Sequence, residues 1–112
     1  MTRLDIAREV RDEAEILHVQ GELDLTTADD LDKAIEATSR PVVVLDLGML
    51  VFVDSAGLRT IDVGHRRLAS SGRTLRIVAP PDSRAEWTFR VAGTDDLVIP
   101  SVEDALRQDD PD

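Results

Sequence analysis

The sequence has no cysteine and very few aromatic residues: its 112 residues include two Phe, one Trp and no Tyr. Without thiols the chain has no disulfide, no thiolate zinc site and no cysteine nucleophile. With so few rings, the core must be built from aliphatic side chains. The two histidines, His18 and His65, do not form the pair that a transition-metal site usually needs.

Basic charge is also scarce. The sequence has 13 Lys and Arg residues and 23 Asp and Glu residues, which gives a formal net charge of −10. Lys33 is the single lysine. This balance argues against a direct nucleic-acid partner and against anionic membranes. It suits a protein that meets a basic protein surface, although acidic charge that only maintains solubility is an equally good explanation.

Long apolar runs are missing too. No stretch approaches the roughly 20 residues of a membrane span, and the N-terminus lacks a signal-peptide layout, so we expect a cytoplasmic protein. The length suffices for one core. We expect one domain over residues 1–107 and a disordered acidic tail over residues 108–112.

The chain is organised around one stretch, residues 42–58. Val42 to Leu47 is a short, β-branched apolar run that predicts a strand buried on both faces. A helix is predicted from about Ser55 to Ser71, with Gly72 after it. Its predicted buried arc consists of Leu58, Ile61, His65, Leu68 and Ala69. Its predicted exposed row consists of Ser55, Arg59, Asp62 and Arg66.

The remaining elements flank this unit. Strands are predicted at Leu4–Val10 and at Ile16–Val19, the second ending at Gly21, so that together they form a hairpin. Further strands are predicted at Leu75–Val78 and Leu97–Ile99. Three further helices are predicted: one over residues 28–38 with a Thr27/Asp30 capping box, one capped by Asp82 and ending at Gly93, and one opened by Ser101. This order predicts an α/β fold with a mixed, mostly parallel sheet of four to five strands and about four helices.

Catalytic readings of Asp54 to Gly57 (Asp-Ser-Ala-Gly) meet obstacles. The strand-to-helix turn is like a hydrolase nucleophile elbow, but Val53 stands where its first glycine belongs. His65 would lie roughly 15 Å along the same helix from Ser55. We therefore assign no catalytic residue.

The sequence gives equally little support for a metal site or for a phospho-aspartyl receiver site. Asp24, Asp46 and Asp54 are candidates to converge, but a magnesium ion there would need a substrate phosphate as well. A phospho-aspartyl receiver needs a lysine near its acidic cluster, and Lys33 lies on the first helix. We expect no metal and no cofactor.

Ser55 has two readings, a helix cap or a modification site. Asp54 is an equally good cap, which would leave the Ser55 hydroxyl spare. A phosphate on Ser55 would meet the positive end of a helix and reach Arg59 one turn on, with Asp54 opposing it. That layout is typical of a charge switch.

Two blocks resemble the bacterial anti-sigma factor antagonists, which are single STAS domains. The first is Gly21 to Ala28 (Gly-Glu-Leu-Asp-Leu-Thr-Thr-Ala). The second is Val44 to Leu47 leading to Phe52–Leu58 (Phe-Val-Asp-Ser-Ala-Gly-Leu). The resemblance spans roughly Leu4 to Leu106 and implies a single STAS-like domain.

The resemblance also implies a mechanism for regulating sigma-factor-dependent transcription, for example in a stress response. In this family an anti-sigma factor, itself a serine kinase, phosphorylates the serine at the position of Ser55, and a phosphatase resets it. The unphosphorylated form binds the anti-sigma factor and frees the sigma factor. We expect the partner-binding face to comprise Asp24, Leu25, Thr26, Thr27, Asp54, Ser55, Ala56, Gly57, Arg59, Asp62, Val63 and Arg66.

Two positions depart from the family pattern. Arg59 stands where members often have glycine, and Asp62 where they have an apolar residue. Such a pair can alter the choice of partner, blunt the switch or pair with the phosphate. Other STAS-like domains act as scaffold or sensor modules, or as subunits of lipid-transport assemblies, without serine phosphorylation. A small-ligand or nucleotide-binding role is a further alternative.

Overall fold

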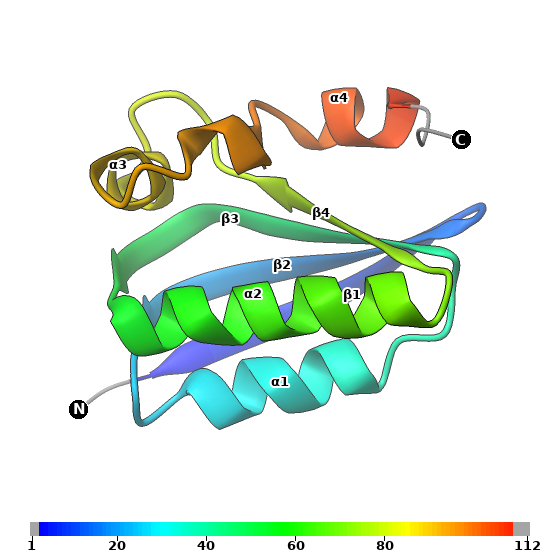
Figure 1. Ribbon diagram of the computed structural model, residues 1–112, viewed down its shortest axis with the longest axis horizontal. Coiled ribbons are helices and arrows are strands. Elements are labelled where there is room, and N and C mark those ends of the chain that lie inside the picture. The colour runs from blue at the N-terminus through cyan, green and yellow to red at the C-terminus, as the bar shows by residue number, and fades with distance from the viewer. Residues whose placement is uncertain (1–2, 109–112) are drawn as a thin grey trace.

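The computed structural model describes residues 3–108, so the predicted tail at residues 108–112 lies outside them except for its first residue. Figure 1 shows the arrangement of the elements. In chain order they are β1 (Leu4–Arg11), β2 (Ala14–Leu23), α1 (Ala28–Glu36), β3 (Val42–Val53), α2 (Ser55–Ser70), β4 (Thr74–Val78), α3 (Arg84–Val91), the 3-10 helix η1 (Asp95–Leu97), β5 (Val98–Ile99) and α4 (Val102–Arg107).

One five-stranded sheet organises the domain, with strand order β1-β2-β3-β4-β5. The β1–β2 hairpin is antiparallel, and every later pair is parallel. Parallel neighbours require crossover connections, which the helices supply. The predicted α/β class, with its mostly parallel sheet, is therefore confirmed, as are the hairpin and the helix that begins at Ser55.

The sheet has a heavily covered face and a partly open one. Helices α1, α2 and α3 pack on the first, where α1 and α2 run side by side (Figure 1). Its core is almost entirely aliphatic, as the composition requires. On the other face, α4 covers a smaller cluster centred on Ile16, Val44 and Val78. None of the helices between residues 3 and 108 combines the length and apolar character needed to span a bilayer.

Two strands extend further than predicted. β3 continues past Leu47 to Val53, and β2 continues past Gly21 to Leu23. The ladder between them persists through two register shifts, and Leu23 pairs with Val53 at its end. Gly21 has a φ of +108° next to the second shift, a conformation that suits glycine. These long strands carry the loops of the candidate site.

Two predicted caps are wrong. The Thr27 side chain makes no cap bond to α1; its hydroxyl donates instead to the Glu22 carbonyl oxygen at 2.8 Å. Ser83, not Asp82, caps α3 by accepting from the Glu86 amide at 3.1 Å. Asp82 has a φ of +68°, so it lies in the turn before the helix.

For other elements the type was predicted correctly but the buried positions or the bounds were not. The buried positions of α2 are Gly57, Ile61, Gly64 and Leu68, with Leu58 half-buried, whereas His65 and Ala69 are exposed. Leu97 belongs to η1 and not to the last strand. The cap of α4 is confirmed, since Ser101 Oγ accepts from the Asp104 amide at 3.1 Å.

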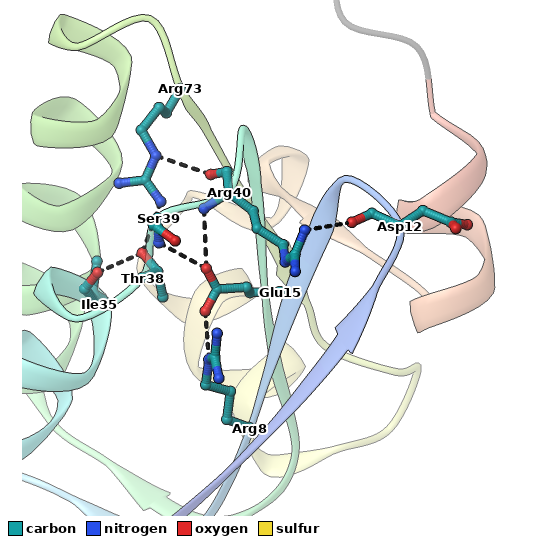
Figure 2. A network of polar contacts seen from close by, with 8 residues as sticks. All are labelled: Arg8, Asp12, Glu15, Ile35, Thr38, Ser39, Arg40 and Arg73. Atoms are coloured by element: carbon teal, nitrogen blue, oxygen red, sulfur yellow. Dashed lines mark hydrogen bonds and ion pairs between the residues drawn. The ribbon is translucent and has the colours of Figure 1, made fainter.

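A buried carboxylate anchors the end of the domain near the β1–β2 turn (Figure 2). Glu15 Oε1 accepts from the amides of Ser39 at 2.7 Å and Arg40 at 3.0 Å, and Oε2 pairs with Arg8 Nε at 2.6 Å. Burial by itself would raise the pKa of Glu15, but these donors outweigh it and lower the pKa to about 2. The connection from α1 to β3 is therefore held by charge-assisted bonds.

Candidate functional site

Ser55 is the first residue of α2 and directly follows the junction with β3. Asp54 is the N-cap residue, and its Oδ1 accepts from the Gly57 amide at 3.0 Å. Its φ of −110° and ψ of −175° are typical of an N-cap. Because Asp54 does the capping, the exposed Ser55 side chain is not required for that role.

The turn is held tightly against the end of β2. The Asp54 amide donates to the Leu23 carbonyl oxygen at 3.1 Å. A Cβ at Gly57 would lie 2.7 Å from Leu23 Cγ and 3.0 Å from Leu23 O, so only glycine fits without displacement. Gly57 is thus needed for close packing, and it fixes the position of Ser55 relative to the loop after β2.

That loop, residues 24–27, is ordered by its own side chains. Asp24 Oδ1 accepts from the Thr26 amide at 2.9 Å and from the Thr26 hydroxyl at 2.7 Å. Thr27 Oγ1 accepts from the Asp24 amide at 3.0 Å while donating to Glu22 O. These local bonds hold the loop in one conformation and leave Leu25 projecting, with 79% of its surface exposed.

The predicted row on α2 is exposed along its length: Ser55, Arg59, Asp62 and Arg66 all face solvent. Asp62 Oδ2 pairs with Arg66 Nη2 at 2.7 Å, across one helical turn. Arg59 follows Ser55 at the i,i+4 spacing. Arg59 is therefore the cation on α2 that is nearest in sequence to the hydroxyl and is not engaged by Asp62.

A shallow groove of about 360 Å³ lies between α1 and α2. Leu25 and Ala28 line one side, and Arg59, Thr60 and Val63 line the other. Arg67 of α2 pairs with Asp32 of α1 at 3.1 Å across it. The structure therefore brings Leu25, Arg59 and Val63, three predicted site residues, to one surface, whereas Asp62 lies on the side of α2 that faces α3.

Sequence reasoning missed part of this region. The exposed apolar side chains Met49, Val51 and Phe52 precede the site on β3, at 63%, 64% and 46% exposure. The groove residues Asp32 and Arg67 were also missed. Arg67 lies four residues after Val63 and eight after Arg59, so helical spacing alone could have placed it on the groove.

Of the three candidate carboxylates, Asp24, Asp46 and Asp54, Asp46 is engaged by a histidine. Its carboxylate bonds His18 Nδ1 at 2.8 Å, and Glu9 bonds His18 Nε2 at 2.8 Å. The bond with Glu9 raises the pKa of His18 above its ordinary 6.5, partial burial opposes this, and Asp46 adds to the rise. Within residues 3–108, no group of three or more His, Cys, Asp or Glu residues is arranged to hold a metal ion.

The arrangement suits modification and binding. A phosphate on Ser55 would lie at the positive end of a 16-residue helix, with Arg59 one turn away and the Asp54 carboxylate beside it. The added charge of about −1.5 to −2 would thus change the electrostatics of this surface. The neighbouring groove offers apolar contact through Leu25 and Val63.

Comparison with known families finds a match over residues 6–100 to the family model described as Mlab, STAS domain. A search of curated protein sequences found no significant match.

Solved structures with the same fold include an anti-sigma factor antagonist from Mycobacterium paratuberculosis. It is 28% identical, with a TM-score of 0.81 over 93% of this chain and 92% of that one. The phosphorylated form of the Bacillus cell fate determinant SpoIIAA is 18% identical, with a TM-score of 0.68 over 91% and 96% of the two chains. A sulfate transporter family protein from Wolinella succinogenes is 18% identical, with a TM-score of 0.71 over 88% and 85%. The last two similarities concern the fold alone.

Proposed function

Because this chain belongs to the STAS domain family, we propose that it is an anti-sigma factor antagonist that binds an anti-sigma factor kinase and is switched off by phosphorylation of Ser55. The observation that carries the proposal is that two different residues, Asp54 and Ser55, supply the cap and the exposed hydroxyl at the start of α2. Asp54 caps the helix, so the exposed Ser55 hydroxyl can be modified without loss of the cap. The similarity to the mycobacterial antagonist supports the same role.

The partner binds the face formed by the loop at residues 24–27, the start of α2 and the α1–α2 groove. Leu25 and Val63 supply the apolar contacts, and Arg59 and Asp54 supply the polar ones. The kinase transfers the γ-phosphoryl group of ATP to Ser55 Oγ. The Oγ–P bond forms as the bond to ADP breaks, and the hydroxyl proton passes to the kinase. The new negative charge next to Asp54 and near Asp24 repels a partner surface shaped for a neutral hydroxyl, and a phosphatase reverses the change.

This protein is a substrate of an enzyme and not an enzyme itself. A serine hydrolase would need a histidine within hydrogen-bond reach of Ser55. His18 is held between Glu9 and Asp46 on the other face of the sheet, and His65 lies ten residues along α2, about 15 Å by helix rise. Neither imidazole is placed to activate the hydroxyl. In the proposed role the protein acts in the cytoplasm, where sigma factors work.

The test is intact mass spectrometry after incubation with ATP and a candidate anti-sigma kinase from the same genome. Wild type is expected to gain one phosphate and Ser55→Ala none. Ser70→Ala is the matched control, because Ser70 is an exposed serine at the other end of α2. It is expected to behave as wild type.

A second candidate is a STAS scaffold or sensor module, or a subunit of a transport assembly, that works without serine phosphorylation. The observation that supports this candidate is the fold shared with a sulfate transporter family protein. A stable kinase complex without phosphate would contradict the switch but retain the binding role. If the protein gains no phosphate and forms no complex with any kinase of this type, the second candidate is favoured.

A further inference from the structure

A cavity of about 280 Å³ lies beneath α2, between that helix, β4 and the segment from α3 to η1. Its floor is apolar and buried, formed by Ile61, Leu75, Ile77 and Phe89. Small-molecule sites typically begin at around 300 Å³, so this cavity suits a small apolar body and is too small for a nucleotide.

The mouth of the cavity is polar, and α2 supplies most of it. Arg59, Asp62 and His65 line it at steps of three residues, which places them along one side of the helix. The Asp62 carboxylate is neutralised by Arg66 at 2.7 Å. The guanidinium of Arg59 makes no hydrogen bond or ion pair with any residue between 3 and 108. In a chain of net charge −10, this mouth presents a cation and an imidazole N–H donor above an apolar floor.

We propose that the cavity binds a small amphipathic carboxylate, such as a medium-chain fatty acid. The alkyl chain packs on Phe89 and Ile61, and the carboxylate pairs with Arg59 at the mouth. Arginine binds carboxylates in a two-point geometry, and a partly enclosed pair is stronger than one fully in water. A neutral ligand would forgo this pairing, so the cavity is expected to prefer the anion.

Arg59 also lines the α1–α2 groove and lies one turn after Ser55. A carboxylate held by Arg59 would therefore compete with a phosphate on Ser55 for the same guanidinium. This regulatory consequence rests on the proposed function, whereas the binding site itself does not.

The test is a titration of the full, isotope-labelled chain with octanoate, followed by amide chemical shifts in NMR spectra. We expect saturable shifts at Ile61, Phe89 and Thr94, residues of the cavity wall. Octanamide, which keeps the alkyl chain and lacks the charge, is expected to bind at least about tenfold more weakly. Arg59→Gln is expected to weaken octanoate binding by a similar factor while leaving octanamide binding unchanged.

Two variants locate the site. Ala92 is exposed and lines the cavity, so Ala92→Phe is expected to fill the space and abolish the shifts without unfolding the protein. Arg84→Gln is the matched control, since Arg84 lies over the Trp87 ring, outside the cavity. Absence of saturable shifts, equal affinity for octanoate and octanamide, or binding that survives Ala92→Phe would each overturn the proposal. Because no kinase takes part, such a failure leaves the proposed phosphorylation standing.

Discussion

At the scale of single residues, Gly57 controls how closely α2 approaches the sheet. The side chain and carbonyl of Leu23 occupy the space that a methyl group at Gly57 would need. Backbone atoms cannot move aside as a flexible side-chain tip does. The geometry of Ser55 therefore depends on a residue that carries no functional group.

The substitution Gly57→Ala is expected to lower the free energy of unfolding by about 1–3 kcal/mol, the usual range for overpacking. The better helix propensity of alanine offsets part of that cost. Gly64→Ala is the matched control on the same helix. Its added Cβ comes closest to Ile35 Cδ1, at 3.0 Å, the movable end of a side chain, and its other neighbours, Ile35 Cγ2 at 3.6 Å and Leu75 Cδ2 at 3.9 Å, lie at ordinary van der Waals distance. Urea unfolding of both variants is the measurement, and an equal or larger loss for Gly64→Ala would contradict the argument.

Some residue roles could be predicted from sequence and others could not. Local chemistry limits the N-cap of α2 to Asp54 or Ser55, because a cap bond spans only three residues, and the structure gives that role to Asp54. The hydroxyl of Thr27 was misassigned because its acceptor, Glu22 O, belongs to the preceding strand. His65 was placed in the core because helical phase alone does not show that it lies exposed at the mouth of the cavity between α2 and α3.

At the scale of elements, β3 and the connection before it position the candidate site. The first half of β3 was predictable from sequence, since Val43 to Leu45 are apolar and fully buried. Its second half was not, because Met49, Val51 and Phe52 are apolar yet exposed. That segment is a strand because it pairs with β2 across two register shifts, which no local pattern reports.

The start of β3 depends on Glu15. We expect Glu15→Gln to lower the free energy of unfolding at pH 7 by about 2–4 kcal/mol, since it removes the charge from a buried, fully bonded carboxylate. The folded-state pKa of about 2 lies below the ordinary 4.5, so this stabilisation is present above pH 4.5 and is lost as the pH falls toward 2.

Unfolding by urea at pH 7 and pH 3 measures this loss. The difference between wild type and Glu15→Gln is expected to shrink at the lower pH. Glu36→Gln, which changes an exposed glutamate at the end of α1, is the control and is expected to stay near wild type at both values. A difference of constant size would show that the Glu15 carboxylate is not the titrating group.

At the scale of the whole molecule, stability is expected to fall on both sides of neutral pH. The Glu15 network weakens in acid. His18 acts in the opposite direction: its raised pKa means that its contribution is complete below pH 6.5 and is lost as the pH rises through the folded value. Because the His18 side chain is 38% exposed, screening limits this loss to about 1 kcal/mol or less.

Thermal unfolding of wild type, His18→Gln and His65→Gln at pH 6 and pH 9 tests the alkaline side. Wild type and His65→Gln are expected to lose stability at pH 9, whereas His18→Gln is expected to lose less. His65 is the control because it is an exposed histidine that bonds neither Glu9 nor Asp46. An identical loss of stability at pH 9 in all three proteins would show that groups other than His18 cause it.

The strand order also has a consequence for how the chain folds as it is synthesised. Each strand pairs with the one that precedes it in the chain, so no strand has to be inserted between two already paired. The β1–β2 hairpin can form as soon as it leaves the ribosome. Each following helix and strand then adds to a free edge. The sheet can thus be assembled in chain order during synthesis, one edge strand at a time.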